Sequence, residues 1–222
     1  KHDVDYVFEC TGKFNSKDKL EAHLSNGAKK IIVSAPCKNA DKTIVFGVNE
    51  KNITTNDKVI SAASCTTNCL APVVHVLHEN FEIESGFMTT IHAFTSDQRI
   101  LDNSHKDQRR ARSASLSIIP TSTGASKAIA EIIPSLKGKL DGIAMRVPTP
   151  NVSLIDLTFV PNKEVSSESI NDAMSKAAKG PLKGILATNS APLVSKDFNH
   201  NPHSSIFDLT QTQVIKGKFS RV

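Results

Sequence analysis

Two short, continuously apolar runs flank a helical stretch within the first part of the chain, and this order constrains the fold most. Residues 4–9 and 30–34 are rich in β-branched and aromatic side chains, which is typical of strands covered on both faces. Residues 16–26 between them predict a helix, with Ser16 as its N-cap and Gly27 just after its end. This strand, helix and strand predict a parallel pair in an α/β fold.

The glycine pattern leaves the identity of this first sheet open. Residues 43–48 and 59–61 predict two further short strands, but no G-x-G-x-x-G pattern occurs among the ten glycines. Either the sheet is not a dinucleotide-binding fold, or the first half of that fold precedes Lys1. Because the chain also lacks an initiator Met, we expect it to be a piece of a longer protein.

The sequence pattern changes near residues 62–65, where we place a domain boundary. Helical spacing of apolar residues and longer alternating runs predict three helices and three strands, at 65–81, 125–133, 167–179, 86–95, 142–147 and 152–160. We therefore predict that residues 1–64 form one domain with a parallel sheet. Residues 65–222 would form a second, α+β domain with a mixed sheet and helices on one face.

Composition describes a globular protein and narrows its partners. The 222 residues carry a formal net charge of +5, which admits nucleic acid, an acidic membrane or small anionic substrates. A single Tyr and no Trp leave few side chains for stacking on bases, so nucleic-acid binding is disfavoured. No apolar run approaches the roughly 20 residues of a membrane span, and no signal peptide is recognised. We therefore expect a cytoplasmic protein without membrane partners.

The four cysteines are more consistent with free thiols than with disulfides or a metal centre. A chain of this size without a secretory signal is expected to keep its thiols reduced. The alternative, a zinc site, would draw on four residues of one predicted helix, namely Cys65, Cys69, His75 and His78. It is disfavoured because Cys69 and His75 point to different faces of that helix. We predict no metal site.

Cys65 lies in the first turn of the predicted helix, within the run SCTTNC at 64–69. Free backbone N–H groups and the positive end of the helix dipole favour a thiolate there and lower the pKa of the thiol. The same N–H groups can hold an oxyanion or a phosphate. An inert core cysteine behind a serine cap is the alternative.

His92 strengthens the reactive interpretation of Cys65. It lies in the apolar strand segment MTTIHAFT at 88–95, where an unpaired imidazole is costly. Such a histidine needs a partner, which is either a backbone carbonyl or a reactive group. A cysteine and a histidine in contact would form a nucleophile and its base.

Several long, ordered segments give the chain a family resemblance. The run SCTTNCLAP at 64–72 resembles the catalytic signature of glyceraldehyde-3-phosphate dehydrogenases, and the resemblance extends over essentially the whole chain. The other matching segments are ECTG at 9–12, TTIH at 89–92, RRAR at 109–112, IPTSTGA at 119–125, RVPTPNVS at 146–153 and SSIFD at 204–208. The resemblance implies that 1–64 is the C-terminal part of a Rossmann-type NAD-binding domain and that 65–222 is the catalytic domain.

The resemblance implies a phosphorylating aldehyde dehydrogenase of glycolysis and gluconeogenesis. Cys65 would be the nucleophile that forms a thioester with D-glyceraldehyde 3-phosphate, and His92 would be its base. NAD would accept the hydride, and inorganic phosphate would release 1,3-bisphosphoglycerate. Thr95 and Arg146 would hold the substrate phosphate. The attacking phosphate would be received by Ser64, Thr66, Thr123, Gly124 and Arg110.

Arginine suits phosphate binding because its guanidinium can bind two oxygens at once. The binding of small anions therefore explains the basic cluster at 105–112. The choice of Arg110 over Arg109 and Arg112 rests on the family match alone.

Only part of the implied cofactor site lies within this chain. The family's glycine-rich turn, the acid that reads the adenosine ribose and the C-terminal Asn-Glu-Trp segment fall outside it. The residues of the cofactor site that remain are Thr11, Gly12 and Ser34. Ser96 stands where the family usually has an Asn near the nicotinamide.

The choice between NAD and NADP is not decided by these residues. Asn103-Ser104 stands where strictly NAD-dependent relatives have Leu-Pro, in a loop that approaches the ribose from a neighbouring subunit. A serine hydroxyl there could hydrogen-bond a 2′-phosphate, which proline could not. We expect NAD as the main cofactor, with weaker selectivity against NADP than a Leu-Pro enzyme shows.

Further expectations concern the assembly and the alternatives. The resemblance implies a homotetramer of the complete enzyme, and we expect the 222-residue chain alone to be inactive, because its parallel sheet lacks strands at one edge. One alternative is erythrose-4-phosphate dehydrogenase, which shares the signature but hydrolyses its thioester. The other is a non-catalytic fragment that binds anions through its basic surface. The complete set of phosphate-binding residues favours the phosphorylating enzyme.

Overall fold

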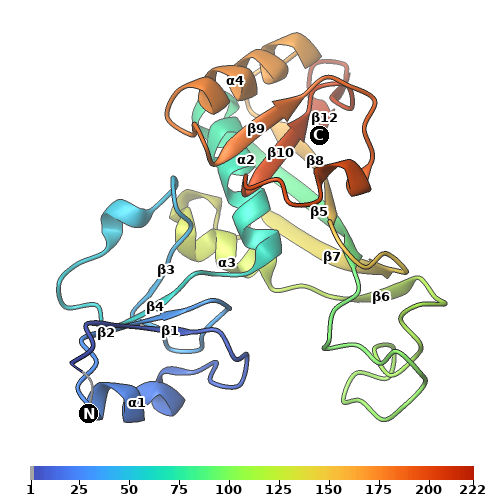
Figure 1. Cartoon of the computed structure of the whole chain (residues 1–222). Helices are drawn as coiled ribbons and strands as arrows, with labels where there is room; N and C mark the ends of the chain where they lie inside the picture. Colours follow the sequence, from blue (N-terminus) through green and yellow to red (C-terminus); the bar gives the residue numbers. More distant parts are fainter. Residues whose placement is uncertain (1–2) are drawn as a thin grey trace.

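Four parallel strands form the first sheet of the computed structural model, which describes residues 3–222 (Figure 1). Helix α1 (Lys17–Ser25) connects the first two of them, which pair in parallel. The order of strands in the sheet is β1 (Tyr6–Glu9), β2 (Lys30–Val33), β4 (Val59–Ser61) and β3 (Lys42–Thr43). The predicted strand–helix–strand unit is therefore confirmed.

A small apolar cluster holds α1 to this sheet. Leu20 of α1 is fully buried in a cluster with the sheet residues Ile31, Val33 and Val59. Ser16 precedes the helix in extended conformation, but its side chain makes no capping hydrogen bond. The helix is therefore held by apolar packing rather than by the expected serine cap.

The predicted strand at residues 43–48 is wrong for most of its length. Strand β3 ends at Thr43, and the chain then turns around the side chain of Asn49. That side chain accepts a hydrogen bond from the Val45 N–H (2.8 Å) and donates one to the Thr43 carbonyl (3.0 Å). Gly47 takes a φ of +85° in this turn, which L side chains rarely adopt. Val45 packs into the larger core, so this turn ties the first sheet to the rest of the chain.

A mixed six-stranded sheet dominates the rest of the chain. Its strands β5 (Ile83–Ala93) and β7 (Leu140–Val147) run parallel, and the other neighbouring pairs are antiparallel. The order is β11-β12-β8-β5-β7-β6, and the remaining strands are β6 (Ile119–Ser122), β8 (Leu154–Pro161), β11 (Gln213–Ile215) and β12 (Phe219–Arg221). A separate parallel pair consists of β9 (Leu186–Asn189) and β10 (Ser205–Asp208). The predicted mixed sheet is confirmed, although the sequence pattern indicated only β5, β7 and β8.

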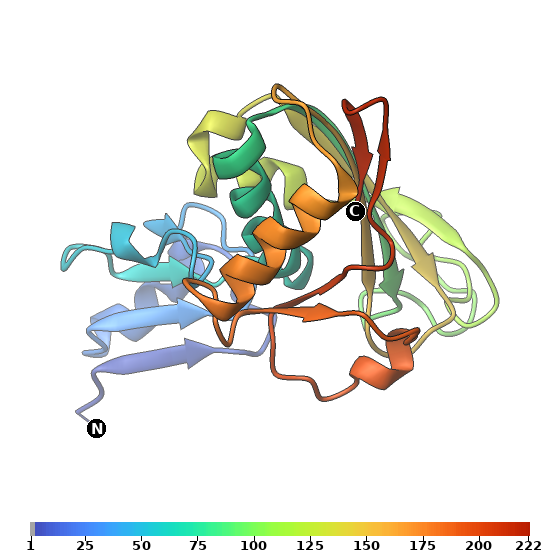
Figure 2. The same ribbon diagram turned by 90° about the horizontal axis from the view of Figure 1, so that it is seen from above.

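Helices α2 (Cys65–Phe81), α3 (Ala125–Ile132) and α4 (Ser167–Lys179) lie on one face of this sheet, as predicted (Figure 2). Three short 3-10 helices complete the structure, at Glu50–Asn52, Pro134–Leu136 and Ser195–Phe198. The core between helices and sheet includes five side chains that are at most 1% exposed, namely Leu77, Met88, Ile129, Phe159 and Ile170. Burial of each such side chain stabilises the folded state by about 1.5–3 kcal/mol. Within residues 3–222, the length and apolar character that a membrane span needs are found in no helix.

The register of the parallel pair β5 and β7 places the polar residues of the site. His92 lies opposite Arg146, and two residues earlier Thr90 lies opposite Ala144. Because side chains alternate across a strand, all four point to the same face of the sheet, which is the face covered by the helices. The ends of α2 and α3 therefore meet these residues.

Candidate active site

A strained turn between β4 and α2 positions Cys65 at the site. Ala63 has a φ of +58°, a left-handed conformation that is costly for a residue with a Cβ. The hydroxyl of Ser61 supports it by accepting a hydrogen bond from the Ala63 N–H (3.1 Å) and donating one to the Ala35 carbonyl (2.9 Å). The sharp turn lets the helix begin directly after the strand.

Ser64 caps the first turn of α2. Ser64 accepts a hydrogen bond from the Thr67 N–H through its side chain (3.1 Å). The amide of Asn68 clamps the same turn by donating to the carbonyls of Ala62 (2.8 Å) and Ser64 (2.9 Å). Cys65 is therefore held in the first helical turn, where backbone N–H groups and the helix dipole favour an anion.

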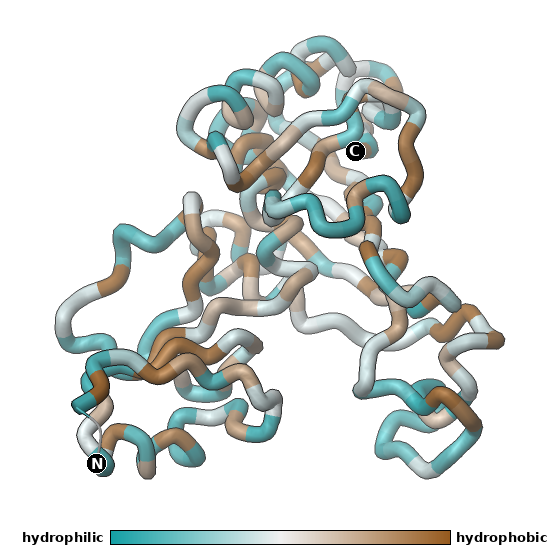
Figure 3. Tube along the Cα trace, viewed as in Figure 1, coloured by the Kyte–Doolittle hydropathy of each residue, from teal (hydrophilic) through white to brown (hydrophobic). Residues whose placement is uncertain are grey.

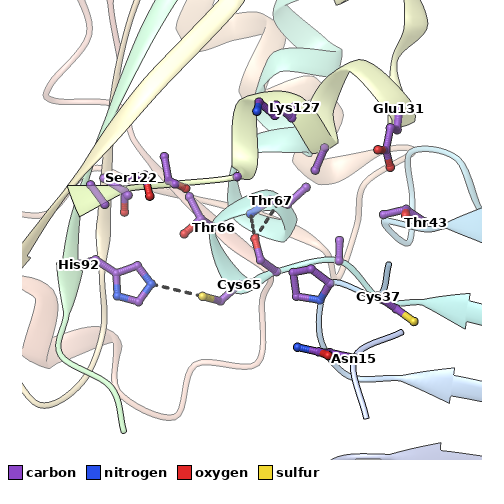
Figure 4. A pocket seen from close by; sticks show the side chains of 18 of the residues that line it. Asn15, Cys37, Thr43, Cys65, Thr66, Thr67, His92, Ser122, Lys127 and Glu131 are labelled. Carbon is purple, nitrogen blue, oxygen red and sulfur yellow. Dashed lines mark hydrogen bonds between the residues drawn. The ribbon is translucent and has the colours of Figure 1, made fainter. Parts of the chain in front are cut away.

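The structure brings Cys65 and His92 together, at the distance expected for a nucleophile and its base. Cys65 Sγ lies 3.3 Å from His92 Nε2 (Figure 4). The other ring nitrogen, Nδ1, lies 2.6 Å from the carbonyl oxygen of Ala93. Because a carbonyl only accepts hydrogen bonds, Nδ1 must carry a proton, and the lone pair of neutral His92 is left on Nε2, facing the thiol.

Arg146 shares the same carbonyl. Its Nη1 donates to the Ala93 carbonyl oxygen (3.1 Å) and lies 3.1 Å from His92 Nδ1. Since both Arg146 and protonated Nδ1 are donors, the carbonyl is the acceptor that joins them. His92 itself is only 6% exposed, so its orientation is fixed by these neighbours.

The environment of Cys65 favours its thiolate. The hydrogen bond between Cys65 and His92 lowers the pKa of Cys65 from 9.0 to about 7. Burial opposes this shift, and the charge of His92 and hydrogen bonds with Thr66 support it. Burial raises the pKa of Cys69, although Ser205 opposes it, and burial also raises the pKa of Cys37. The reactive thiol is therefore distinguished from its neighbour four residues later on the same helix.

A cavity of about 590 Å³ opens beside this pair. It is lined by Cys65 and His92. Six of the predicted anion-binding residues also line it, namely Ser64, Thr66, Arg110, Thr123, Gly124 and Arg146. Of the three arginines at 109–112, all within the described part of the chain, Arg110 is the one that lines it. The structure thus gathers residues from two helix N-termini, a loop and the sheet around one space (Figure 4).

Arg110 is fixed at the wall of the cavity by a network of acids and hydroxyls. Its Nε donates to Thr121 Oγ1 (3.0 Å), its Nη2 to the Ser122 carbonyl (3.3 Å) and its Nη1 to the Asp97 carboxylate. Asp107 accepts a hydrogen bond from the Thr121 hydroxyl (2.9 Å). Burial opposes the ionisation of Asp97, but the hydrogen bond and the charge of Arg110 lower its pKa below the ordinary value.

The remaining predicted residues lie outside the cavity lining. Thr95 is at its edge, where its hydroxyl lies 3.4 Å from Arg146 Nη1. Thr11, Gly12 and Ser34 are exposed and follow the carboxyl ends of the neighbouring strands β1 and β2. This edge of a parallel sheet is where ligands of α/β proteins bind, so these three residues lie in a suitable place for a dinucleotide.

Sequence reasoning missed the far side of the cavity, which is lined by Asn15, Cys37, Thr43, Lys127 and Glu131 (Figure 4). Lys127 and Glu131 follow Gly124 at helical spacing on α3, and this spacing could have predicted them from the sequence. The first three come from separate segments of the first sheet and share no pattern in the sequence. Within residues 3–222, no group of three or more ligating side chains is placed to hold a metal ion.

The fold and the site define an α/β protein with an activated cysteine at a helix N-terminus. The chain belongs to the glyceraldehyde-3-phosphate dehydrogenase family, because residues 64–222 match the family model described as glyceraldehyde 3-phosphate dehydrogenase, C-terminal domain.

Bacterial relatives match nearly the whole chain. Glyceraldehyde-3-phosphate dehydrogenase of Cereibacter sphaeroides is 56% identical over 219 residues, which are 99% of this chain and 66% of the relative. The Zymomonas mobilis protein of that name is 57% identical over 221 residues, with the same coverage. Glyceraldehyde-3-phosphate dehydrogenase 2 of Bacillus subtilis is 54% identical over 223 residues, covering 100% of this chain and 66% of the relative. The chain thus spans about two thirds of the length of these relatives.

We predict that Cys65 is the thiol that iodoacetamide alkylates fastest at neutral pH. Its thiolate forms as pH rises through about 7, so the rate should rise through the same range and level off above it. In a His92→Asn variant the midpoint should move up toward 9.0, because the largest cause of the lowered pKa is lost. At pH 7 the rate should then fall by about ten- to a hundredfold.

Mass spectrometry after substoichiometric labelling measures this rate for each cysteine. His75→Asn, on the outer part of α2, is the matched control and should leave the profile of Cys65 unchanged. Labelling of Cys69 or Cys37 before Cys65 would contradict the assignment.

Proposed function

We propose that this protein, as the complete enzyme, oxidises D-glyceraldehyde 3-phosphate to 1,3-bisphosphoglycerate with NAD and inorganic phosphate. Here the complete enzyme means this chain extended to the length of its relatives. The observation that carries the proposal is the 3.3 Å contact between Cys65 Sγ and His92 Nε2 beside a cavity with two arginines. A nucleophile, its base and anion-binding groups are the parts that this reaction requires.

Cys65 and His92 divide the covalent chemistry between them. The lone pair of Nε2 takes the proton of the thiol, and the thiolate sulfur forms a bond to the aldehyde carbon. Protonated Nε2 then gives this proton to the alkoxide oxygen that the attack creates, and takes it back from the resulting hydroxyl when the carbon is oxidised, because the same nitrogen faces the atoms bonded to sulfur. The Ala93 carbonyl stabilises the protonated ring through Nδ1 throughout.

The chain's residues at the carboxyl edge of the first sheet fit a dinucleotide. Gly12 has a φ of +72° and an added Cβ there would meet nothing within 4 Å, so the turn is open on its outer side. Thr11, Gly12 and Ser34 would hold the cofactor along this edge. When bound, NAD supplies the acceptor for the hydride that leaves the substrate carbon.

Two groups of residues would bind the two phosphates. Arg146 and Thr95 lie together and would hold the phosphate already on the substrate. The attacking phosphate would lie between the N-termini of α2 and α3, where free N–H groups favour anions, and would contact Ser64, Thr66, Thr123, Gly124 and Arg110. Binding both at once brings the second phosphate to the thioester carbon.

Erythrose-4-phosphate dehydrogenase and a non-catalytic anion-binding fragment remain as alternatives. Hydrolysis needs only water at the thioester, whereas all five residues assigned above to the attacking phosphate line this cavity. A non-catalytic role would give the lowered pKa of Cys65 no purpose. Both points favour the phosphorylating enzyme.

We predict that the complete enzyme reduces NAD for a single turnover when aldehyde is supplied alone. Further turnovers should require phosphate as well. The His92→Asn variant should acylate roughly two to four decades more slowly, since it lacks the base. Stopped-flow absorbance of NADH gives the acylation rate. Turnover without phosphate, or higher turnover with erythrose 4-phosphate, would contradict the proposal; no turnover at all would favour the non-catalytic alternative.

We also propose a homotetramer, supported by two exposed apolar surfaces. The outer face of the six-stranded sheet carries Phe87, Ile143, Leu154 and Phe219, which are 36–53% exposed. The loop between β5 and β6 projects from the body with hydrophobic stretches (Figure 3), among them Leu101, Leu116 and Ile118 at 68–82% exposure. Such surfaces are typical of subunit contacts.

We predict that sedimentation velocity of the complete enzyme shows four-chain particles. Leu116→Asp should shift the distribution to smaller species, because a charge would be buried in the contact. Leu193→Asp, at another exposed apolar position, is the control and should not. A monomer at micromolar concentration would contradict the tetramer.

We further propose that NAD is preferred with modest selectivity against NADP. Ser104 is exposed; its N–H donates to Asn103 Oδ1 (2.7 Å) and its carbonyl accepts from Arg99 Nε (3.0 Å). These bonds fix the backbone and leave the hydroxyl to face solvent or a ligand. A hydroxyl can donate to a 2′-phosphate.

We predict that Ser104→Pro raises the ratio of kcat/KM for NAD over NADP in the complete enzyme. Proline also removes the N–H that bonds Asn103, so Ser104→Ala, which removes the hydroxyl alone, is the matched variant. Both should raise the ratio by a few fold. An unchanged ratio in both variants would show that this loop does not read the ribose.

A further inference from the structure

Two residues that line the cavity beside Cys65 have no role in the reaction described above. They are Thr90 of β5 and Ala144 of β7, which are paired in the sheet. They lie two residues before His92 and Arg146 on the same face of the same strands.

The hydroxyl of Thr90 is buried without a partner. Thr90 is 1% exposed, and its Oγ1 makes no hydrogen bond to any group within residues 3–222. Leaving a buried hydroxyl unpaired is unfavourable, so native structures rarely retain one without a reason. Thr67, equally buried on the same wall, is by contrast paired with the Ser64 hydroxyl at 2.7 Å.

The charged groups around this hydroxyl favour an anionic ligand. Arg110 and Arg146 bring two positive charges to the cavity, and α2 and α3 both begin at its wall. Asp97 is already bonded to Arg110, and the acid that lines the cavity, Glu131, is on its far side. A hydroxyl that lacks an acceptor among protein groups, in a positively charged space, is suited to donate to an oxyanion.

We propose that Thr90 donates a hydrogen bond to the attacking inorganic phosphate and so forms the floor of its site. The proposal rests on the proposed function and adds a residue to the same site. Phosphate carries four oxygens, of which those turned away from the thioester carbon need donors on the inner side. Thr90 supplies one there, while Thr66 and Thr123 line the helical walls.

The test uses Thr90→Val and Thr90→Ser in the complete enzyme. Valine keeps the shape and removes the hydroxyl; because that hydroxyl is unpaired in the protein, the fold should not suffer. Thr90→Val should raise the KM for phosphate about tenfold or more, which is the usual effect of losing a hydrogen bond to a charged group. Thr90→Ser should restore most of the affinity, and Thr188→Val on β9 should have no effect.

A second measurement does not depend on turnover. Inorganic phosphate should raise the thermal unfolding temperature of the wild type, and this increase should be smaller in Thr90→Val, since a ligand stabilises in proportion to its binding. Arsenate should behave like phosphate in both proteins.

Two results would overturn the inference. One is an unchanged phosphate KM together with an unchanged phosphate-induced shift in unfolding temperature. The other is an acylation rate that falls as much as the phosphate affinity does, which would mean that Thr90 positions His92 instead. A wild-type enzyme that shows no phosphate-dependent turnover would defeat the proposed function itself, and is thereby distinguished from both.

Discussion

The site depends on one contact, the 3.3 Å approach of Cys65 Sγ to His92 Nε2. The sulfur is positioned by the start of a helix, and the imidazole by the end of a strand on the other side of the core. Hydrogen bonds weaken steeply when their geometry changes, so the contact requires that α2 and β5 keep their relative position. The fully buried Leu77 and Met88 belong to the core cluster that fixes it. The chemistry is thus set by packing far from the reacting atoms.

The charges around the cavity are arranged to accept anions without collapsing in their absence. Arg110 is neutralised in part by Asp97, which keeps the guanidinium at the wall. Arg146 has no carboxylate partner within residues 3–222. Burial and the charge of Arg110 lower the pKa of Arg146, while the charges of Cys65 and Asp97 oppose that shift. An arginine held in this way gains from a bound phosphate both a counter-charge and a hydrogen-bond acceptor. Anion binding is therefore favoured by groups that the fold has already placed.

Local signals in the sequence anticipated much of the site. The serine before Cys65 and the apolar spacing after it specify the start of α2, and the apolar strand around His92 specifies a buried imidazole in need of a partner. The error at residues 43–48 has a physical cause: the apolar residues there serve a turn that inserts into another part of the core, so their pattern is not that of a strand. Strands β6 and β9 to β12 were missed because they are three or four residues long, too short for a periodic signal.

The sequence by itself determined the α/β class, the first strand–helix–strand unit, the position of Cys65 in a helical first turn and the family resemblance. These features follow from residues close together in the chain, where propensity, capping and periodicity act. Only the tertiary structure decided that His92 faces the thiol through Nε2, that Asp97 fixes Arg110, and that Thr90 lines the same cavity as Cys65. Those facts depend on strand register and on the packing of helices against a sheet, and these are set by contacts between residues distant in the sequence.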